Sequence, residues 1–133
     1  MVVVKFGKKM VLSSLLVSSL ALPSIAAAYS GSYSFDIRSS VTGSTKHSLK
    51  AATAKTTVKA NTYNSSGSVQ STKSDYQVNL SKFLKAYAVS GIPANGSSYT
   101  KSFGTISSGD YVVSVFKSDS TGYSIKGSGT INQ

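Results

Sequence analysis

The C-terminal stretch from Phe103 to Ile131 constrains the fold most, because its apolar residues recur at alternate positions. Tyr111, Val113 and Val115 fall on one side of an extended strand, since strand side chains point alternately to opposite faces. Val112 and Phe116 fall on the other side, so this strand has apolar groups on both faces. The pattern therefore predicts a buried β-strand near the end of the chain.

A second strand is expected to follow directly. Tyr123, Ile125 and Ile131 share one face of an extended segment, and residues 119–122 (Asp-Ser-Thr-Gly) have turn composition. Gly122 is predicted to take a positive φ in that turn. The two segments together predict a C-terminal β-hairpin.

Similar alternation predicts further strands at residues 33–37, 56–62, 76–80 and 99–103. In the second of these, Thr56, Val58, Ala60 and Thr62 are expected to face inward. Asn95-Gly96 is a strong hairpin signal, since both residues tolerate positive φ.

Residues 80–87 are ambiguous, because Leu80, Phe83, Leu84 and Tyr87 also stand at helical spacing. A helical turn at residues 81–86 is one alternative. We favour a bend followed by a strand at residues 86–90, since an isolated helix of this length is marginal.

Seven or eight short strands separated by Gly/Ser/Asn turns predict an all-β fold. We expect a single antiparallel β-sandwich with an immunoglobulin-like Greek-key arrangement; a small barrel is the alternative. Residues 29–133 suit one domain, expected to be a monomer. The chain has no cysteine, so the sheets must hold together without disulfides.

Residues 1–28 have the pattern of a secretory signal peptide. Lys5, Lys8 and Lys9 form a basic start, an apolar run follows from Met10 to Ile25, and residues 26–28 are alanines suited to cleavage. The apolar run is short for a membrane anchor, which is the alternative. We expect a secreted, extracellular protein that begins at Tyr29.

Few residues are suited to catalysis. The acidic residues are four aspartates, His47 is the single histidine, and the chain has no glutamate or cysteine. A Ser–His–Asp triad stays open, because triads are assembled in space. Gly127-Ser128-Gly129 lacks the strand-to-helix context of a dinucleotide site. We expect no enzyme activity, no metal site and no cofactor.

Charge is the strongest functional asymmetry. The chain has 14 basic and 4 acidic residues, and none of the acidic ones lies between Ile37 and Ser74. That interval contains six basic residues: Arg38, Lys46, Lys50, Lys55, Lys59 and Lys73. A field of one sign attracts polyanions, although it also keeps a β-protein soluble and protects its edges.

From this run we predict an anion-binding site formed by Lys46, Lys50, Lys55, Lys59 and Tyr63. Lys117 and Lys126 are expected to contribute less, because Asp110 and Asp119 lie near them in sequence. Aromatic residues are too few here for a nucleic-acid signature, so nucleic acid would be bound without sequence specificity.

The ending from Ala94 to Ile131 resembles small, mostly uncharacterised secreted proteins of Gram-positive, spore-forming bacteria. Residues 102–113 (SFGTISSGDYVV) also resemble the strand–turn–strand that closes the core of prealbumin-like and collagen-adhesin sandwiches. The resemblance covers the last third of the chain. It implies an immunoglobulin-like sandwich and carries no catalytic residue or cross-link.

The leading hypothesis is a secreted, non-enzymatic, cationic β-sandwich that binds an anionic cell-envelope surface or an extracellular polymer. A secreted antimicrobial or toxin-like antagonist is one alternative, weakened by the lack of an amphipathic cationic helix. A protein-binding inhibitor or matrix module that uses an exposed sheet edge is another.

Overall fold

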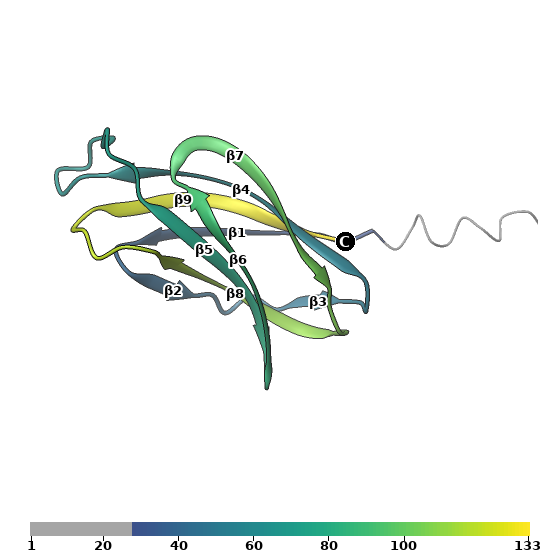
Figure 1. The fold of residues 1–133 in the computed structure, drawn as a ribbon. Coiled ribbons are helices and arrows are strands. Elements are labelled where there is room, and N and C mark those ends of the chain that lie inside the picture. Colours follow the sequence, from purple (N-terminus) through teal and green to yellow (C-terminus); the bar gives the residue numbers. More distant parts are fainter. Residues whose placement is uncertain (1–27) are drawn as a thin grey trace, which may run out of the picture.

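The computed structural model describes residues 28–133, which form two packed antiparallel sheets, a β-sandwich (Figure 1). The predicted antiparallel β-sandwich is confirmed, with nine strands in place of the expected seven or eight because two strands of only three residues add to the count. The predicted signal peptide lies outside the described residues, apart from Ala28. The nine strands are β1 (Ser30–Ile37), β2 (Ser40–Thr42), β3 (His47–Leu49), β4 (Thr53–Tyr63), β5 (Asp75–Lys82), β6 (Lys85–Pro93), β7 (Asn95–Thr105), β8 (Gly109–Lys117) and β9 (Ser124–Asn132).

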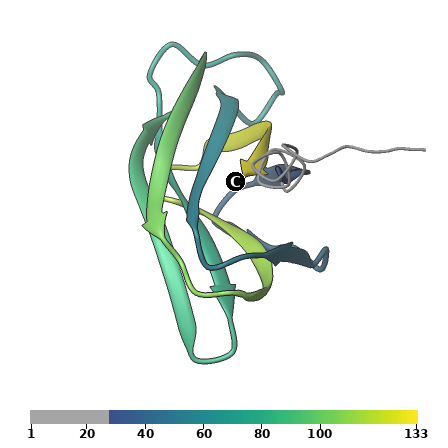
Figure 2. The ribbon, with the colours of Figure 1, turned by 90° about the vertical axis from the view of Figure 1, so that its right-hand side faces the viewer.

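The chain changes sheet at almost every connection. One sheet has the order β1-β9-β4-β7 and the other β2-β8-β5-β6, with the short β3 also paired to β8. Among the described strands, β5 and β6 are the one pair of sequence neighbours that are hydrogen-bonded to each other. Figure 2 shows this hairpin at the lower end of the molecule. Contacts between distant parts of the sequence therefore hold the sandwich together.

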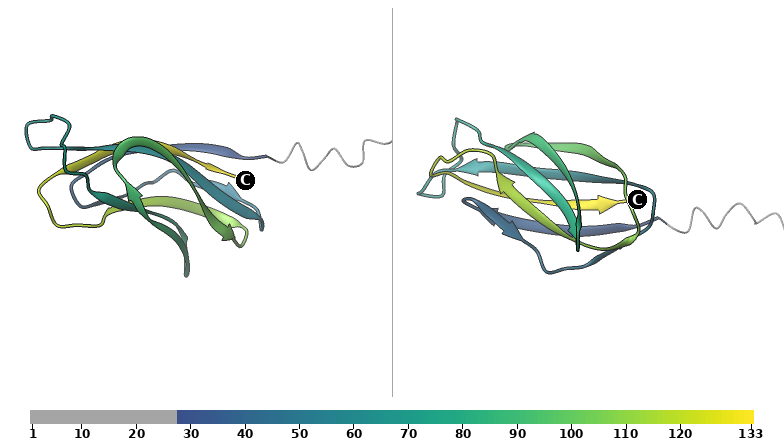
Figure 3. Two further views of the ribbon diagram at one scale, coloured as in Figure 1. Left: turned by 45° about the horizontal axis from the view of Figure 1, so that its top comes forward. Right: turned by 60° about the horizontal axis from the view of Figure 1, so that its bottom comes forward.

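The predicted C-terminal hairpin is wrong. β8 pairs with β2, β3 and β5, whereas β9 lies in the other sheet between β1 and β4. The left view of Figure 3 shows the yellow β9 and the yellow-green β8 in different layers. The alternating pattern identified the buried sides of both strands correctly, because a strand with one buried face has an apolar residue at every second position. It could not identify their hydrogen-bonding partners.

The hairpin predicted at Asn95-Gly96 is also wrong. The chain crosses between the sheets at Ala94, so that β6 and β7 lie in different sheets. Gly96 does have a positive φ of 88°. Gly96 lies next to a shift in register between β4 and β7, where Asn61 pairs with Asn95. The sequence signal marked a bulge, which needs the same backbone freedom as a turn.

The strand favoured at residues 86–90 is confirmed, and it is longer than predicted, since β6 runs from Lys85 to Pro93. Phe83 and Leu84 form a two-residue connection between β5 and β6. Lys82 pairs with Lys85 at the end of the ladder.

The core lies between the two sheets and is made by the alternating inward positions of the long strands. On β4 the four residues predicted to face inward are all buried. On β8, Tyr111, Val113 and Val115 are buried, as predicted. The largest fully covered side chains are Tyr76, Tyr111, Leu80, Ile92, Ile106, Ile125 and Ile131.

Two glycines on β9 let that strand fit against its neighbours. Tyr33 and Phe35 on β1 pair with Gly129 and Gly127, and the two aromatic rings are stacked with centroids 6.2 Å apart. A Cβ atom at Gly129 would lie 2.7 Å from the Thr57 carbonyl oxygen and 2.8 Å from the Tyr33 hydroxyl. The two aromatic rings of β1 thus cover the positions at which β9 has no side chain, as in other sheets where a ring covers a glycine.

We expect Gly129→Ala to lower the free energy of unfolding by about 1–3 kcal/mol, because the added methyl group overlaps the backbone of β4. Urea midpoints would measure this. Gly122→Ala is the matched control: a Cβ there would have no atom within 4 Å, and the positive φ predicted for Gly122 is not found. Equal midpoints for the two variants would contradict the close packing of β9.

Candidate functional site

The outward side of the sheet β1-β9-β4-β7 carries a group of basic residues that we call the basic face. Lys55 and Lys59 are exposed there on β4, and Tyr63 is half-buried at the end of that strand. These are three of the five predicted site residues. They share a face because they occupy alternate positions of one strand.

Tertiary structure adds two lysines to the basic face. Lys126 on β9 pairs with Asn61 on β4, and its ammonium lies 5.2 Å from the centroid of the Tyr63 ring. The Lys73 ammonium donates a hydrogen bond to Asn61 Oδ1 at 2.9 Å. Lys126 was expected to contribute less than the lysines of residues 46–59; the pairing of β9 with β4, which the sequence does not reveal, places it on the basic face.

A polar groove of about 410 Å³ lies at the Tyr63 end of the basic face. Arg38 and Lys126 line it, together with the carboxylate of Asp36. The remaining lining residues are Asn64, Ser65, Gly67 and Ser124. Two cations, two serine hydroxyls and one amide against one carboxylate make this groove suited to an anionic group.

The other two predicted site residues lie elsewhere. Lys46 and Lys50 are exposed on either side of β3, which belongs to the opposite sheet. The backbone of Lys50 is tied to the C-terminus, since its amide donates to Gln133 Oε1 at 2.8 Å and its carbonyl accepts from Gln133 Nε2 at 2.8 Å. The structure therefore divides the predicted site between two parts of the molecule.

The two outer faces of the sandwich differ in charge. On the outward side of β5, β6 and β8, the register places Asp75 and Asp110 among neutral residues such as Gln77 and Asn79. No lysine or arginine occupies those outward strand positions. On the basic face, Asp36 is the one carboxylate among the outward strand positions, opposite Lys126.

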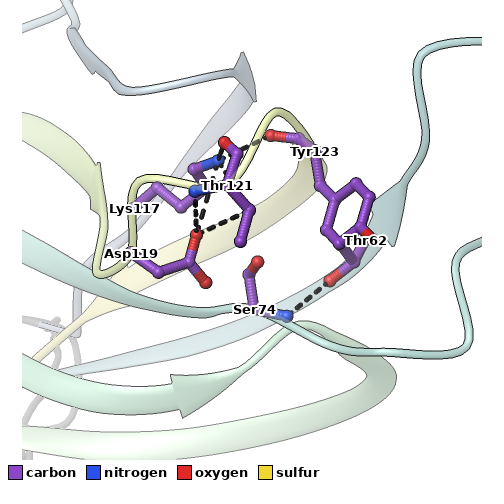
Figure 4. A network of polar contacts seen from close by, with 6 residues as sticks. All are labelled: Thr62, Ser74, Lys117, Asp119, Thr121 and Tyr123. Carbon is purple, nitrogen blue, oxygen red and sulfur yellow. Dashed lines mark hydrogen bonds and ion pairs between the residues drawn. The ribbon is translucent and has the colours of Figure 1, made fainter.

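Lys117 belongs to neither face, because its side chain is fully covered. Its ammonium donates to the carbonyl oxygens of Thr121 and Tyr123, the second at 2.8 Å, and lies 3.5 Å from the Asp119 carboxylate (Figure 4). This is the one ion pair within residues 28–133. Burial opposes ionisation of Asp119, but hydrogen bonds from Thr121 and Ser74 and the Lys117 charge lower its pKa to about 2.

His47 is almost completely buried, with 1% of its surface exposed. Its Nδ1 atom lies 2.8 Å from the Tyr29 hydroxyl. Burial lowers the pKa of His47, so the neutral ring is favoured at neutral pH. In the described chain no aspartate is hydrogen-bonded to His47; Asp110, which pairs with the neighbouring residue Ser48, accepts instead from Ser48 Oγ at 2.6 Å.

His47 also borders a cavity of about 570 Å³ whose lining comes from β1, β8, β9 and the segment containing β2 and β3. Val41, Val113 and Val115 make its apolar part. Its polar part is composed of hydroxyl groups, such as those of Ser32, Ser34 and Thr45. Without a carboxylate or ammonium in the lining, this cavity lacks the paired acid and base that proton transfer needs.

Residues 28–133 contain neither a cluster of metal-binding side chains nor a membrane-spanning helix. No three histidine or aspartate side chains of this segment gather in a way that could hold a metal ion. None of its elements is a helix of the length and apolar character needed to cross a membrane.

Comparison with known proteins gives no relative: no protein-family model matches the chain, and no curated protein does.

We expect Lys117→Met to lower the free energy of unfolding by about 1–3 kcal/mol, because two backbone carbonyls and Asp119 lose a charged donor. Urea denaturation would measure the change. Lys59→Met, an equal change at an exposed position, should stay within about 0.5 kcal/mol of the parent protein. A Lys117 variant as stable as the Lys59 variant would show that the network is not needed for the fold.

The stability of the protein should fall as the pH drops below about 6.5, the ordinary pKa of histidine. The unfolded chain binds a proton on His47 there, whereas burial disfavours protonation in the folded chain, so protons stabilise the unfolded state. Urea midpoints at pH 7.5 and 5.5 would show the loss in the parent protein and little change in His47→Gln. A parent midpoint independent of pH over this range would contradict the burial of His47.

Proposed function

We propose that the protein is a secreted, non-enzymatic β-sandwich that binds an anionic polymer or surface of the cell envelope through its basic face. The observation that carries the proposal is the one-sided charge. Lys55, Lys59 and Lys126 lie on one outer face, and the opposite outer face has aspartates at its charged positions. Other lysines, such as Lys46 and Lys85, lie outside these outward strand positions. Among the outward positions the positive charges are all on one side, where they can act together on a polyanion.

The lysines of the basic face are available to a ligand. Lys55 and Lys59 are exposed, and neither makes an ion pair within the described residues. A sheet face with unpaired ammonium groups produces a positive potential over an extended surface, which suits a repeating anion such as a phosphate-containing polymer. Binding would release the counterions condensed on that polymer, which favours association at low salt.

Hydroxyl side chains fill the outward positions around these lysines. Thr57 on β4 and Thr100 on β7 are opposite each other, with their Oγ1 atoms 2.9 Å apart. Ser128 and Thr130 lie on the other side of β4. Hydroxyl groups donate to phosphate oxygens and exchange hydrogen bonds with sugars, so this surface suits a polyol phosphate or glycan phosphate of a cell wall.

Tyr63 is the aromatic residue of the predicted site, and its ring lies beside the Lys126 ammonium. One aromatic ring offers a single stacking position, whereas proteins that bind single-stranded nucleic acid use several. A wall polymer is therefore favoured over nucleic acid as the partner.

Retention on immobilised lipoteichoic acid across a salt gradient tests the proposal. We expect Lys55→Gln/Lys59→Gln to elute at lower salt than the parent protein and to release roughly two fewer counterions on binding. The urea midpoint of this variant should hardly change, because exposed charges contribute little to folding.

Lys46→Gln/Lys50→Gln is the matched control, since it removes the same charge from the residues that flank β3 and are not part of the basic face. We expect it to elute close to the parent protein. If the two double variants elute together, the net charge of the chain, and not the basic face, determines retention.

A further inference from the structure

The tip of the β5–β6 hairpin exposes two large apolar side chains. Phe83 is 88% exposed and Leu84 86%, and the next most exposed large apolar residue of the described chain is Val69 at 56%. The hairpin extends past the other strands, to the lowest point of the molecule in Figures 1 and 2. Neither residue belongs to the core or packs against it.

The backbone conformation at the tip is unusual for a leucine. Leu84 has a φ of 61°, and it is the one residue other than glycine with a positive φ in the described chain. Glycine or asparagine takes this conformation with less strain and is the usual residue in such turns. A leucine here is both strained and exposed, so the fold itself does not explain it. Strain of this kind is often found at binding sites.

Lysines flank the apolar pair on both strands. Lys85 is exposed at the start of β6. The Lys82 ammonium donates to the Ser108 carbonyl oxygen at 2.7 Å and lies 5.6 Å from the centroid of the Tyr111 ring, so it is held at the base of the tip. Asp110, on the neighbouring strand β8, accepts a hydrogen bond from Ser48. The tip therefore presents an apolar point with positive charge behind it.

We propose that this tip inserts Phe83 and Leu84 into the surface of a lipid bilayer with anionic headgroups, while Lys82 and Lys85 stay at headgroup level. Apolar side chains with lysines beside them are a pattern that suits the boundary between headgroups and acyl chains. The lysines add attraction to anionic lipids at close range. This site is separate from the basic face and does not depend on it.

The geometry favours a bilayer over a second protein. Phe83 and Leu84 stand on a convex turn, and together they offer much less than the roughly 800 Å² per partner that a stable protein interface buries. Neither of the two hollows described above includes them. A fluid bilayer needs no complementary pocket.

Fluorescence provides a direct test, because the chain contains no tryptophan. Phe83→Trp places a single reporter at the tip, and Val69→Trp places one on an exposed loop elsewhere. With vesicles of phosphatidylglycerol and phosphatidylcholine, we expect a blue shift for Trp emission in the Phe83 variant and quenching by nitroxides on the acyl chains. Neither effect should occur in the Val69 variant or with phosphatidylcholine alone.

Three results would overturn the proposal: no shift in the Phe83 variant, an equal shift with neutral vesicles, or a shift without lipid that grows with protein concentration. The last would identify a second copy of the chain as the partner.

Co-sedimentation with the same anionic vesicles measures the contribution of the apolar pair. Phe83→Ser/Leu84→Ser should bind at least about 10-fold more weakly, because two apolar side chains are no longer buried. Val69→Ser is the control. Leu84→Gly removes the backbone strain as well as the side chain, so it should fold at least as stably as the parent protein and still bind more weakly. Binding equal to the parent in both tip variants would overturn the proposal.

The two sites can be separated in one comparison. The tip double variant should keep its retention on lipoteichoic acid. Lys55→Gln/Lys59→Gln, combined with the Phe83→Trp reporter, should keep the blue shift with anionic vesicles.

Discussion

The structure depends on apolar contact between two sheets that no disulfide connects. With no cysteine in the chain, the inward side chains of β4, β5, β8 and β9 supply the cohesion between the layers. Most connections cross from one sheet to the other, so each sheet is assembled from strands far apart in the sequence. The glycines of β9 are part of this arrangement, because they let β9 lie against β4 while aromatic rings from β1 cover the space.

The same crossing arrangement separates the charges. β4 brings Lys55 and Lys59 to one outer face, and β9 adds Lys126 beside them. β5 and β8 bring Asp75 and Asp110 to the other outer face. Lys117 shows the other outcome, since the crossing between β8 and β9 covers its side chain and uses its charge to hold the connecting loop. Position in the fold thus decides which lysines can meet a ligand.

Two surfaces are proposed as sites of interaction, and they differ in chemistry. The basic face is rich in hydroxyl groups and positively charged, whereas the β5–β6 tip is apolar with lysines behind it. One suits a polymer with repeated anionic groups, and the other suits the surface of a bilayer. Both would direct the protein towards negatively charged layers of a cell envelope.

The sequence alone determined the all-β class, most of the strands and the inward or outward position of side chains such as Val113 and Lys59, because alternation reflects burial within one strand. It could not determine which strands are neighbours: the Asp-Ser-Thr-Gly and Asn-Gly segments had turn chemistry, yet one leads across to the other sheet and the other forms a bulge. It therefore grouped Lys46 and Lys50 with the basic face and left out Lys126. Only the tertiary structure decided that grouping, because hydrogen bonding between strands distant in sequence sets which side chains share a face.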